Sequence, residues 1–123
     1  MQAKPVELPL IECSVTFLTP EEGGRATPFP LGALSGNGYR PHLVVDEKSS
    51  LNATGDGWNG EDYIGVAFNS GPEHPLAGSA MTVRLTATYF PHSMYDALRP
   101  GVTFTVREGR QVVGFGSVRR WIR

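Results

Sequence analysis

Apolar and polar residues alternate along six segments of the chain, and this period of two is typical of half-buried β-strands. In the first segment Cys13, Val15 and Phe17 occupy one face, and the residues between them are polar. A second clear case runs from Met81 to Tyr89. The six predicted strands cover residues 11–18, 40–46, 63–68, 81–89, 102–107 and 111–121.

Turn-forming residues separate these segments. The 123 residues include 15 glycines and 10 prolines, and no apolar repeat of 3.6 residues persists beyond about one turn. Residues 93–98 have the pattern of one short helical turn, and Gly109 suits a tight hairpin between the last two strands. Because a closed barrel has no exposed sheet edge, we predict one all-β domain over residues 1–123, a six-stranded antiparallel β-barrel.

The charge is nearly balanced, which limits the classes of function. The chain has 11 basic and 12 acidic residues, a formal net charge of −1, whereas a dedicated nucleic-acid binder carries a basic excess. Cys13 is the one cysteine, so an internal disulfide is excluded, and no adjacent base would activate its thiol. Residues 1–10 lack the pattern of a signal peptide, and no apolar run approaches the ~18 residues of a membrane span. We therefore expect a cytoplasmic protein that does not enter a membrane.

The remaining candidates for metal chemistry are weak. His42, His74 and His92 are far apart in the sequence and lack the spacing of a zinc site. Residues 56–62 have the composition of a calcium loop, but Trp58 stands where an oxygen ligand is required. We expect no metal and no cofactor.

Four segments carry motifs in a fixed order along the chain. They read VTFLTPEEGGRATPF (residues 15–29), GYRP (38–41), LAGSAM (76–81) and FTVREG followed by VGFG (104–116). In this order they resemble the C-terminal, third domain of translation elongation factor Tu. That family has an acidic-Gly-Gly-Arg-His-Thr-Pro-Phe loop, the same Gly-Tyr-Arg-Pro tetrapeptide, a Met-Pro-Gly turn, and Phe-x-Ile-Arg-Glu-Gly before Val-Gly-x-Gly. The resemblance implies a free-standing β-barrel of this type.

The resemblance does not extend to the GTPase of that factor. The family hydrolyses GTP in a separate domain, with a Gly-x-x-x-x-Gly-Lys-Ser/Thr loop that holds the phosphates. No such loop is present in this chain, and no nucleophile–base pair or carboxylate pair stands at motif spacing. We therefore expect a protein that is not an enzyme and does not bind GTP.

The resemblance also implies candidate contact residues. In the family, this domain contacts the T-stem of aminoacyl-tRNA, the nucleotide-exchange factor and its own GTPase domain. Arg25 matches the arginine of the Gly-Gly-Arg-His loop and Gly109 a glycine at the RNA, whereas Ala26 replaces the histidine, His42 a glutamine and Phe90 a lysine. The candidate RNA- or partner-binding residues are Arg25, Tyr39, Arg40, His42, Phe90, Gly109 and Arg110.

Protein binding is the first functional hypothesis. A detached domain retains surfaces that met other domains or partners, and exposed apolar patches mark such sites. Phe29, Pro30 and Leu31 form such a patch unless Phe29 packs into the barrel. One form of this hypothesis is a mimic or antidote that engages a partner of elongation factor Tu. We also expect Met94 and Tyr95, in the long 91–101 connection, to contribute to partner capture without supporting the fold.

RNA binding is the alternative, as a tRNA- or RNA-binding accessory of translation. It has to be local, because the overall charge provides no basic excess. Arg119, Arg120 and Arg123 surround Trp121 and form the one basic cluster with an aromatic residue. Such a cluster contacts a phosphate backbone and stacks a base, or it is a solvated terminal strand.

Overall fold

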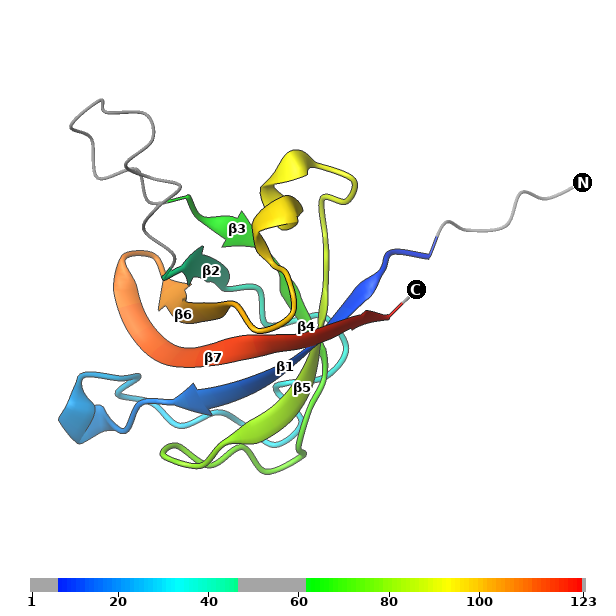
Figure 1. The fold of residues 1–123 in the computed structure, drawn as a ribbon. Coiled ribbons are helices and arrows are strands. Elements are labelled where there is room, and N and C mark those ends of the chain that lie inside the picture. The colour runs from blue at the N-terminus through cyan, green and yellow to red at the C-terminus, as the bar shows by residue number, and fades with distance from the viewer. Residues whose placement is uncertain (1–6, 47–61, 123) are drawn as a thin grey trace, which may run out of the picture.

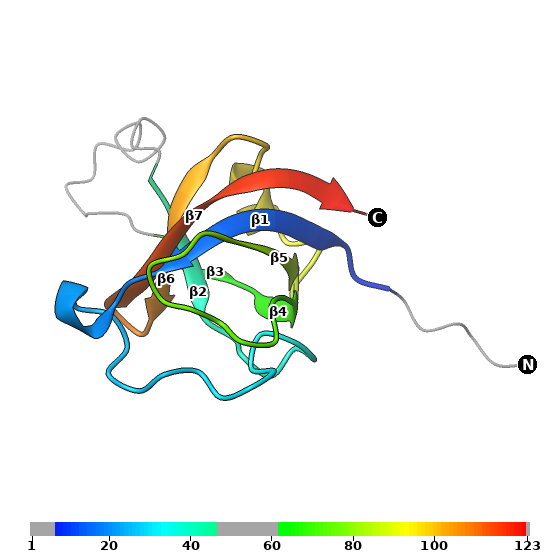
Figure 2. The same ribbon diagram turned by 90° about the horizontal axis from the view of Figure 1, so that it is seen from below.

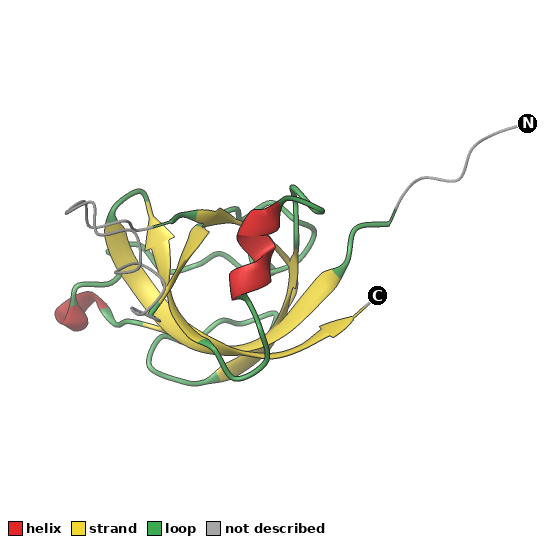
Figure 3. Ribbon diagram, turned by 45° about the horizontal axis from the view of Figure 1, so that its top comes forward, coloured by secondary structure: helices red, strands yellow, loops and turns green. Residues whose placement is uncertain are grey.

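The computed structural model describes residues 7–46 and 62–122 as an all-β domain whose strand pairs are all antiparallel (Figure 1). Two short 3₁₀ helices, η1 (Pro20–Glu22) and η2 (Ser93–Ala97), are the red segments in Figure 3. The strands are β1 (Leu10–Phe17), β2 (His42–Val45), β3 (Ile64–Gly65), β4 (Ala67–Ser70), β5 (Met81–Thr86), β6 (Thr103–Glu108) and β7 (Gln111–Ile122).

The sheet curls into a barrel, with the strand order β3-β2-β6-β7-β1-β5-β4 (Figure 2). Strands β3 and β4 lie at the two ends of this order, yet Val66 alone separates them in the chain. The Val66 N–H donates to the carbonyl of Pro41 (3.4 Å), and the Phe68 N–H donates to that of Tyr39 (2.9 Å). The segment from β3 to β4 therefore joins both edges of the curled sheet.

The prediction of six strands was wrong, because seven are present among the described residues. The predicted strand over 63–68 is divided at Val66, with β3 paired to β2 and β4 paired to β5. Alternation of apolar residues shows that a segment is extended, but it does not show where that segment changes its pairing partner.

The alternating faces of β1 and β5 fill the barrel as the pattern predicted. The predicted strand over 81–89 was too long, because β5 ends at Thr86 and Tyr89 is 58% exposed. Cys13, Val15 and Phe17 of β1 are buried with the inward residues of β5 and β7. Gly116, opposite Val15, allows the strands to approach closely, because an added Cβ would lie 2.1 Å from the carbonyl oxygen of Ser14.

Two of the predicted local elements are also confirmed. Glu108 pairs with Gln111 around a tight turn, in which Gly109 has a φ of +61°. The predicted helical turn is η2.

The expectation for Tyr95 was wrong, because this residue supports the fold. Its side chain is 3% exposed, and its hydroxyl donates to the carbonyl of Gly65 (2.6 Å). The same hydroxyl accepts from the N–H of Tyr89 (2.8 Å). These two bonds attach η2 to β3 and to the connection after β5, so the side chain is not available to a partner.

Candidate functional site

The loop that carries Arg25 is shaped by a helix cap followed by two glycines. The Thr19 hydroxyl accepts from the N–H of Glu22 (3.3 Å), and the Glu22 carboxylate accepts from the N–H of Thr19 (2.8 Å). Gly23 then adopts a φ of +93°, and a Cβ on Gly24 would lie 2.3 Å from the carbonyl oxygen of Leu18. The turn therefore requires both glycines, and it brings Arg25 back toward the barrel.

Arg25 forms the centre of a polar cluster at one end of the barrel. Its guanidinium forms an ion pair with Glu108 and lies over the ring of Phe29, 4.2 Å from the ring centroid. The Tyr39 hydroxyl donates to the same Glu108 oxygen (2.7 Å). We call Arg25, Phe29, Tyr39 and Glu108 the Arg25 cluster.

The environment of Tyr39 keeps its hydroxyl protonated. Burial raises the pKa of this phenol well above its ordinary value, and the hydrogen bond and charge of Glu108 raise it further. Tyr39 is therefore a hydrogen-bond donor to Glu108 and cannot act as a base at neutral pH.

Ring contacts connect the cluster to the hydrophobic core. The ring of Phe29 lies 4.7 Å from that of Phe17 and meets Tyr39 edge-on at 4.9 Å. Tyr39 in turn lies 5.1 Å from Phe68, which is fully buried. Phe29 is thus packed against the core instead of forming an open patch, while Leu31, two residues further along the chain, is 63% exposed.

A cavity of about 120 Å³ lies beside the cluster and is largely apolar. Arg25 and Phe29 form part of its wall, as do Pro75 and Ala77 from the segment before β5. The residues that line it are Phe17, Leu18, Pro20, Arg25, Thr27, Pro28, Phe29, Pro75 and Ala77. We call this the Arg25 pocket.

The Arg25 pocket and the Arg25 cluster bring all four motif segments together. The first supplies Arg25 and Phe29, the second Tyr39, the third Ala77 and the fourth Glu108. Glu108 was missed at the sequence level, although it stands in the Arg-Glu-Gly motif, because no local spacing relates it to an arginine 83 residues away.

The other predicted residues lie apart from this site. Arg40 is exposed and donates to the carbonyl of Asn37 (3.0 Å). Exposed His42 lies beside Tyr63, with ring centroids 5.9 Å apart. Phe90 is half-buried and packs 6.2 Å from Trp121.

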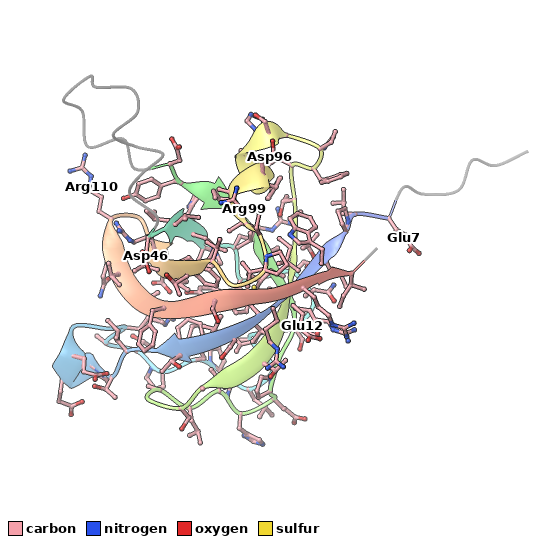
Figure 4. All side chains as sticks on the ribbon, viewed as in Figure 1. Glu7, Glu12, Asp46, Asp96, Arg99 and Arg110 are labelled. Atoms are coloured by element: carbon pink, nitrogen blue, oxygen red, sulfur yellow. The ribbon has the colours of Figure 1, made fainter. Side chains whose placement is uncertain are left out.

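Gly109 and Arg110 are at the tip of the β6–β7 hairpin, next to Glu108 in the chain. Both are exposed, and Figure 4 shows the Arg110 side chain extending away from the barrel. Gln111 ties this hairpin to the Arg25 loop, because its amide donates to the carbonyls of Gly23 and Gly24, both at 3.1 Å. The structure therefore unites Arg25, Tyr39 and the hairpin tip.

Within residues 7–46 and 62–122, no group of three or more histidine, cysteine, aspartate or glutamate side chains is placed to hold a metal ion. The calcium-like segment 56–62 lies outside the described residues except for its last position. Burial raises the pKa of Cys13 to about 12, so its thiol is protonated at neutral pH and a poor nucleophile. None of the described helices has the length and apolar character to cross a membrane.

Fold and site together define an all-β barrel with a polar cluster beside an apolar pocket at one end. No family model matches the chain.

Proposed function

We propose that this protein is a non-catalytic, elongation factor Tu-like binding module that engages a protein partner through the Arg25 pocket. The observation that carries the proposal is that the four motif segments, spread over residues 15–116, meet at the Arg25 cluster and the pocket beside it. The first and third segments line the pocket, while Tyr39 and Glu108 hold Arg25 in its wall. Small concave sites with apolar walls and few polar groups are typical of ligand and side-chain recognition.

The surface around the pocket favours a protein over a charged ligand. The Gly32 N–H donates to the carbonyl of Glu73 (2.9 Å), so the loop after Phe29 lies against the loop before Ala77. Leu31 and Leu76, one on each loop, are 63% and 64% exposed. Exposed leucines on two loops that lie against each other and carry residues of an apolar pocket suit an apolar side chain and its flanking residues in a partner protein.

Phosphate binding by Arg25 has less support. The side chain of this arginine is 25% exposed, and its charge is compensated by Glu108. An RNA phosphate would have to compete with a carboxylate that Tyr39 also holds in place. The tRNA-binding alternative at this site therefore ranks second.

The resemblance to the third domain of elongation factor Tu suggests the class of partner. We propose that the partner is a protein that also grips that domain, so that this protein acts as a mimic or antidote. If so, excess elongation factor Tu displaces the bound partner. Failure of displacement refutes the mimic and leaves pocket-dependent protein binding untouched.

The test is affinity capture of tagged protein from its native lysate, with and without nuclease. Ala77→Trp fills the pocket, and Ala80→Trp places the same side chain on a neighbouring exposed position that does not line it. A protein retained after nuclease by the wild type and Ala80→Trp, but lost with Ala77→Trp, supports the proposal. If no protein is retained after nuclease, or if both variants retain the protein equally, the proposal is contradicted.

A further inference from the structure

A β-bulge in β7 places two consecutive arginines on the same face of the barrel. Cys13 of β1 pairs with Val118, while the preceding Glu12 pairs with Arg120, so Arg119 is an extra residue between two successive pairs. Neighbouring residues in a regular strand point to opposite faces, and a bulge changes this alternation. Both arginines therefore approach Glu12, with Nε to Oε2 distances of 3.9 Å for Arg119 and 3.3 Å for Arg120.

Arg84 of β5 completes a group of three arginines around one carboxylate. It pairs with Glu12 across the β1–β5 ladder, and its Nε lies 3.4 Å from Glu12 Oε1. The three arginine side chains are 43%, 58% and 62% exposed, whereas that of Glu12 is 14% exposed. One carboxylate orients three guanidinium groups and neutralises one of them, so two positive charges face solvent.

Hydroxyl groups and an aromatic ring extend this face along the barrel. Residues two apart on a strand share a face, and Ser14 is paired with both Thr82 of β5 and Ser117 of β7. Two residues further, Thr16 is paired with Phe115, which is 48% exposed. Figure 1 shows β7, β1 and β5 side by side, and Figure 4 places Glu12 among them. We call this surface the arginine face: Glu12, Ser14, Thr82, Arg84, Phe115, Ser117, Arg119 and Arg120.

We propose that the arginine face binds single-stranded nucleic acid, with phosphate groups at the three arginines and a base stacked on Phe115. Arginine guanidinium groups and hydroxyls are common phosphate contacts, and an exposed aromatic ring adds stacking that tolerates any base. Phe115 precedes Arg119 by four residues of β7, which is about 13 Å at ~3.3 Å per residue. The base contact and the phosphate contacts therefore lie at different positions along β7. An acidic peptide would use the charges but not the ring.

This site is independent of the Arg25 pocket. It is formed by the outward residues of β1, β5 and β7, whereas Phe17, on the inward face of β1, lines the pocket. Failure of nucleic-acid binding would therefore leave the protein-binding proposal standing, and the converse also holds.

The experiment measures fluorescence anisotropy of labelled oligouridine with the full chain over a range of salt. If the face neutralises two phosphates, the logarithm of the binding constant should fall with the logarithm of the salt concentration. The expected slope is about −1.4, at about 0.7 per phosphate for single strands. Arg119→Gln/Arg120→Gln should weaken binding at least tenfold, and Phe115→Ser about fivefold or more. Glu12→Gln should tighten binding, a gain that loss of folding could not produce.

The matched control is Arg99→Gln, which removes one charge from an exposed arginine outside both sites and is compared with Arg120→Gln. It should bind like the wild type. The proposal is overturned if the wild type does not bind, or if Arg99→Gln loses as much affinity as Arg120→Gln. It is also overturned if polyglutamate competes as well as oligouridine while Phe115→Ser has no effect, because the face then serves acidic protein.

Discussion

The Tyr39 hydroxyl donates to Glu108 across 69 residues of sequence and so joins the Gly-Tyr-Arg-Pro segment to the β6–β7 hairpin at a distance of 2.7 Å. Arg25, which precedes Tyr39 in the chain, forms an ion pair with the same carboxylate oxygen. Three segments are therefore held by one half-buried carboxylate.

This relationship predicts strong coupling between Tyr39 and Glu108. Tyr39→Phe removes one hydrogen bond and should lower the free energy of unfolding by about 1 kcal/mol. Glu108→Gln removes the ion pair and weakens the same bond, and should cost about 1–3 kcal/mol. The double variant should cost less than the sum, measured by urea unfolding. Strict additivity would show that the two side chains do not interact.

Gly116 should tolerate no side chain. An added Cβ would lie 2.1 Å from the carbonyl oxygen of Ser14, and a backbone atom within a sheet cannot move aside at low cost. Gly116→Ala should lower the free energy of unfolding by about 3 kcal/mol or more, at the upper end of overpacking costs. Gly38→Ala is the matched control, because no atom lies within 4 Å of its added Cβ, and it should change stability by less than about 1 kcal/mol. Equal thermal stabilities of the two variants would contradict this account.

Tyr95 should prove structural when its hydroxyl alone is removed. Tyr95→Phe leaves the N–H of Tyr89 and the carbonyl of Gly65 without this partner and should destabilise the fold by about 1–3 kcal/mol. Met94→Ser, at the half-buried neighbouring position, should cost less. Calorimetric melting of both variants tests the order, and a larger loss for Met94→Ser would refute it.

Acid should weaken the contacts of Glu12. The hydrogen bond from Arg120 holds the pKa of this carboxyl below its ordinary value of 4.5, with the charges of Arg120 and Arg84 contributing. A carboxylate with a lowered pKa in the folded state adds stability above its unfolded pKa, and this stability is lost as the pH falls through the folded pKa. Glu12→Gln should therefore reduce the loss of stability below pH 4.5, measured by melting at low salt. An unchanged pH profile would contradict the contact.

The sequence was sufficient to predict the all-β class and most strands, because the alternation at Cys13, Val15 and Phe17 is a local property of a barrel wall. It was not sufficient for the division at Val66, which depends on pairing with β2 and β5 at once. The arginine pair at Arg119 and Arg120 was visible in the sequence, but the bulge that turns both toward Glu12 was not.

The candidate site was predicted in part for the same reason. Arg25 and Tyr39 were identified from their motifs, whereas Glu108 and Ala77 enter the site through contacts between distant segments. Tyr95 was predicted to lie on the surface because the connection over 91–101 is long. In the structure it is buried, and its hydroxyl donates to the carbonyl of Gly65. The closure of the sheet decides which side chains meet across the barrel. A local sequence pattern contains no information about such contacts between distant segments.

The most direct test of the central claim is the dissociation constant of the captured partner for three purified chains. The account predicts that the wild type and Ala80→Trp bind alike and that Ala77→Trp binds at least tenfold more weakly, since the indole ring fills the Arg25 pocket. Equal dissociation constants for all three chains, each with a melting temperature like that of the wild type, would show that the partner does not use the pocket.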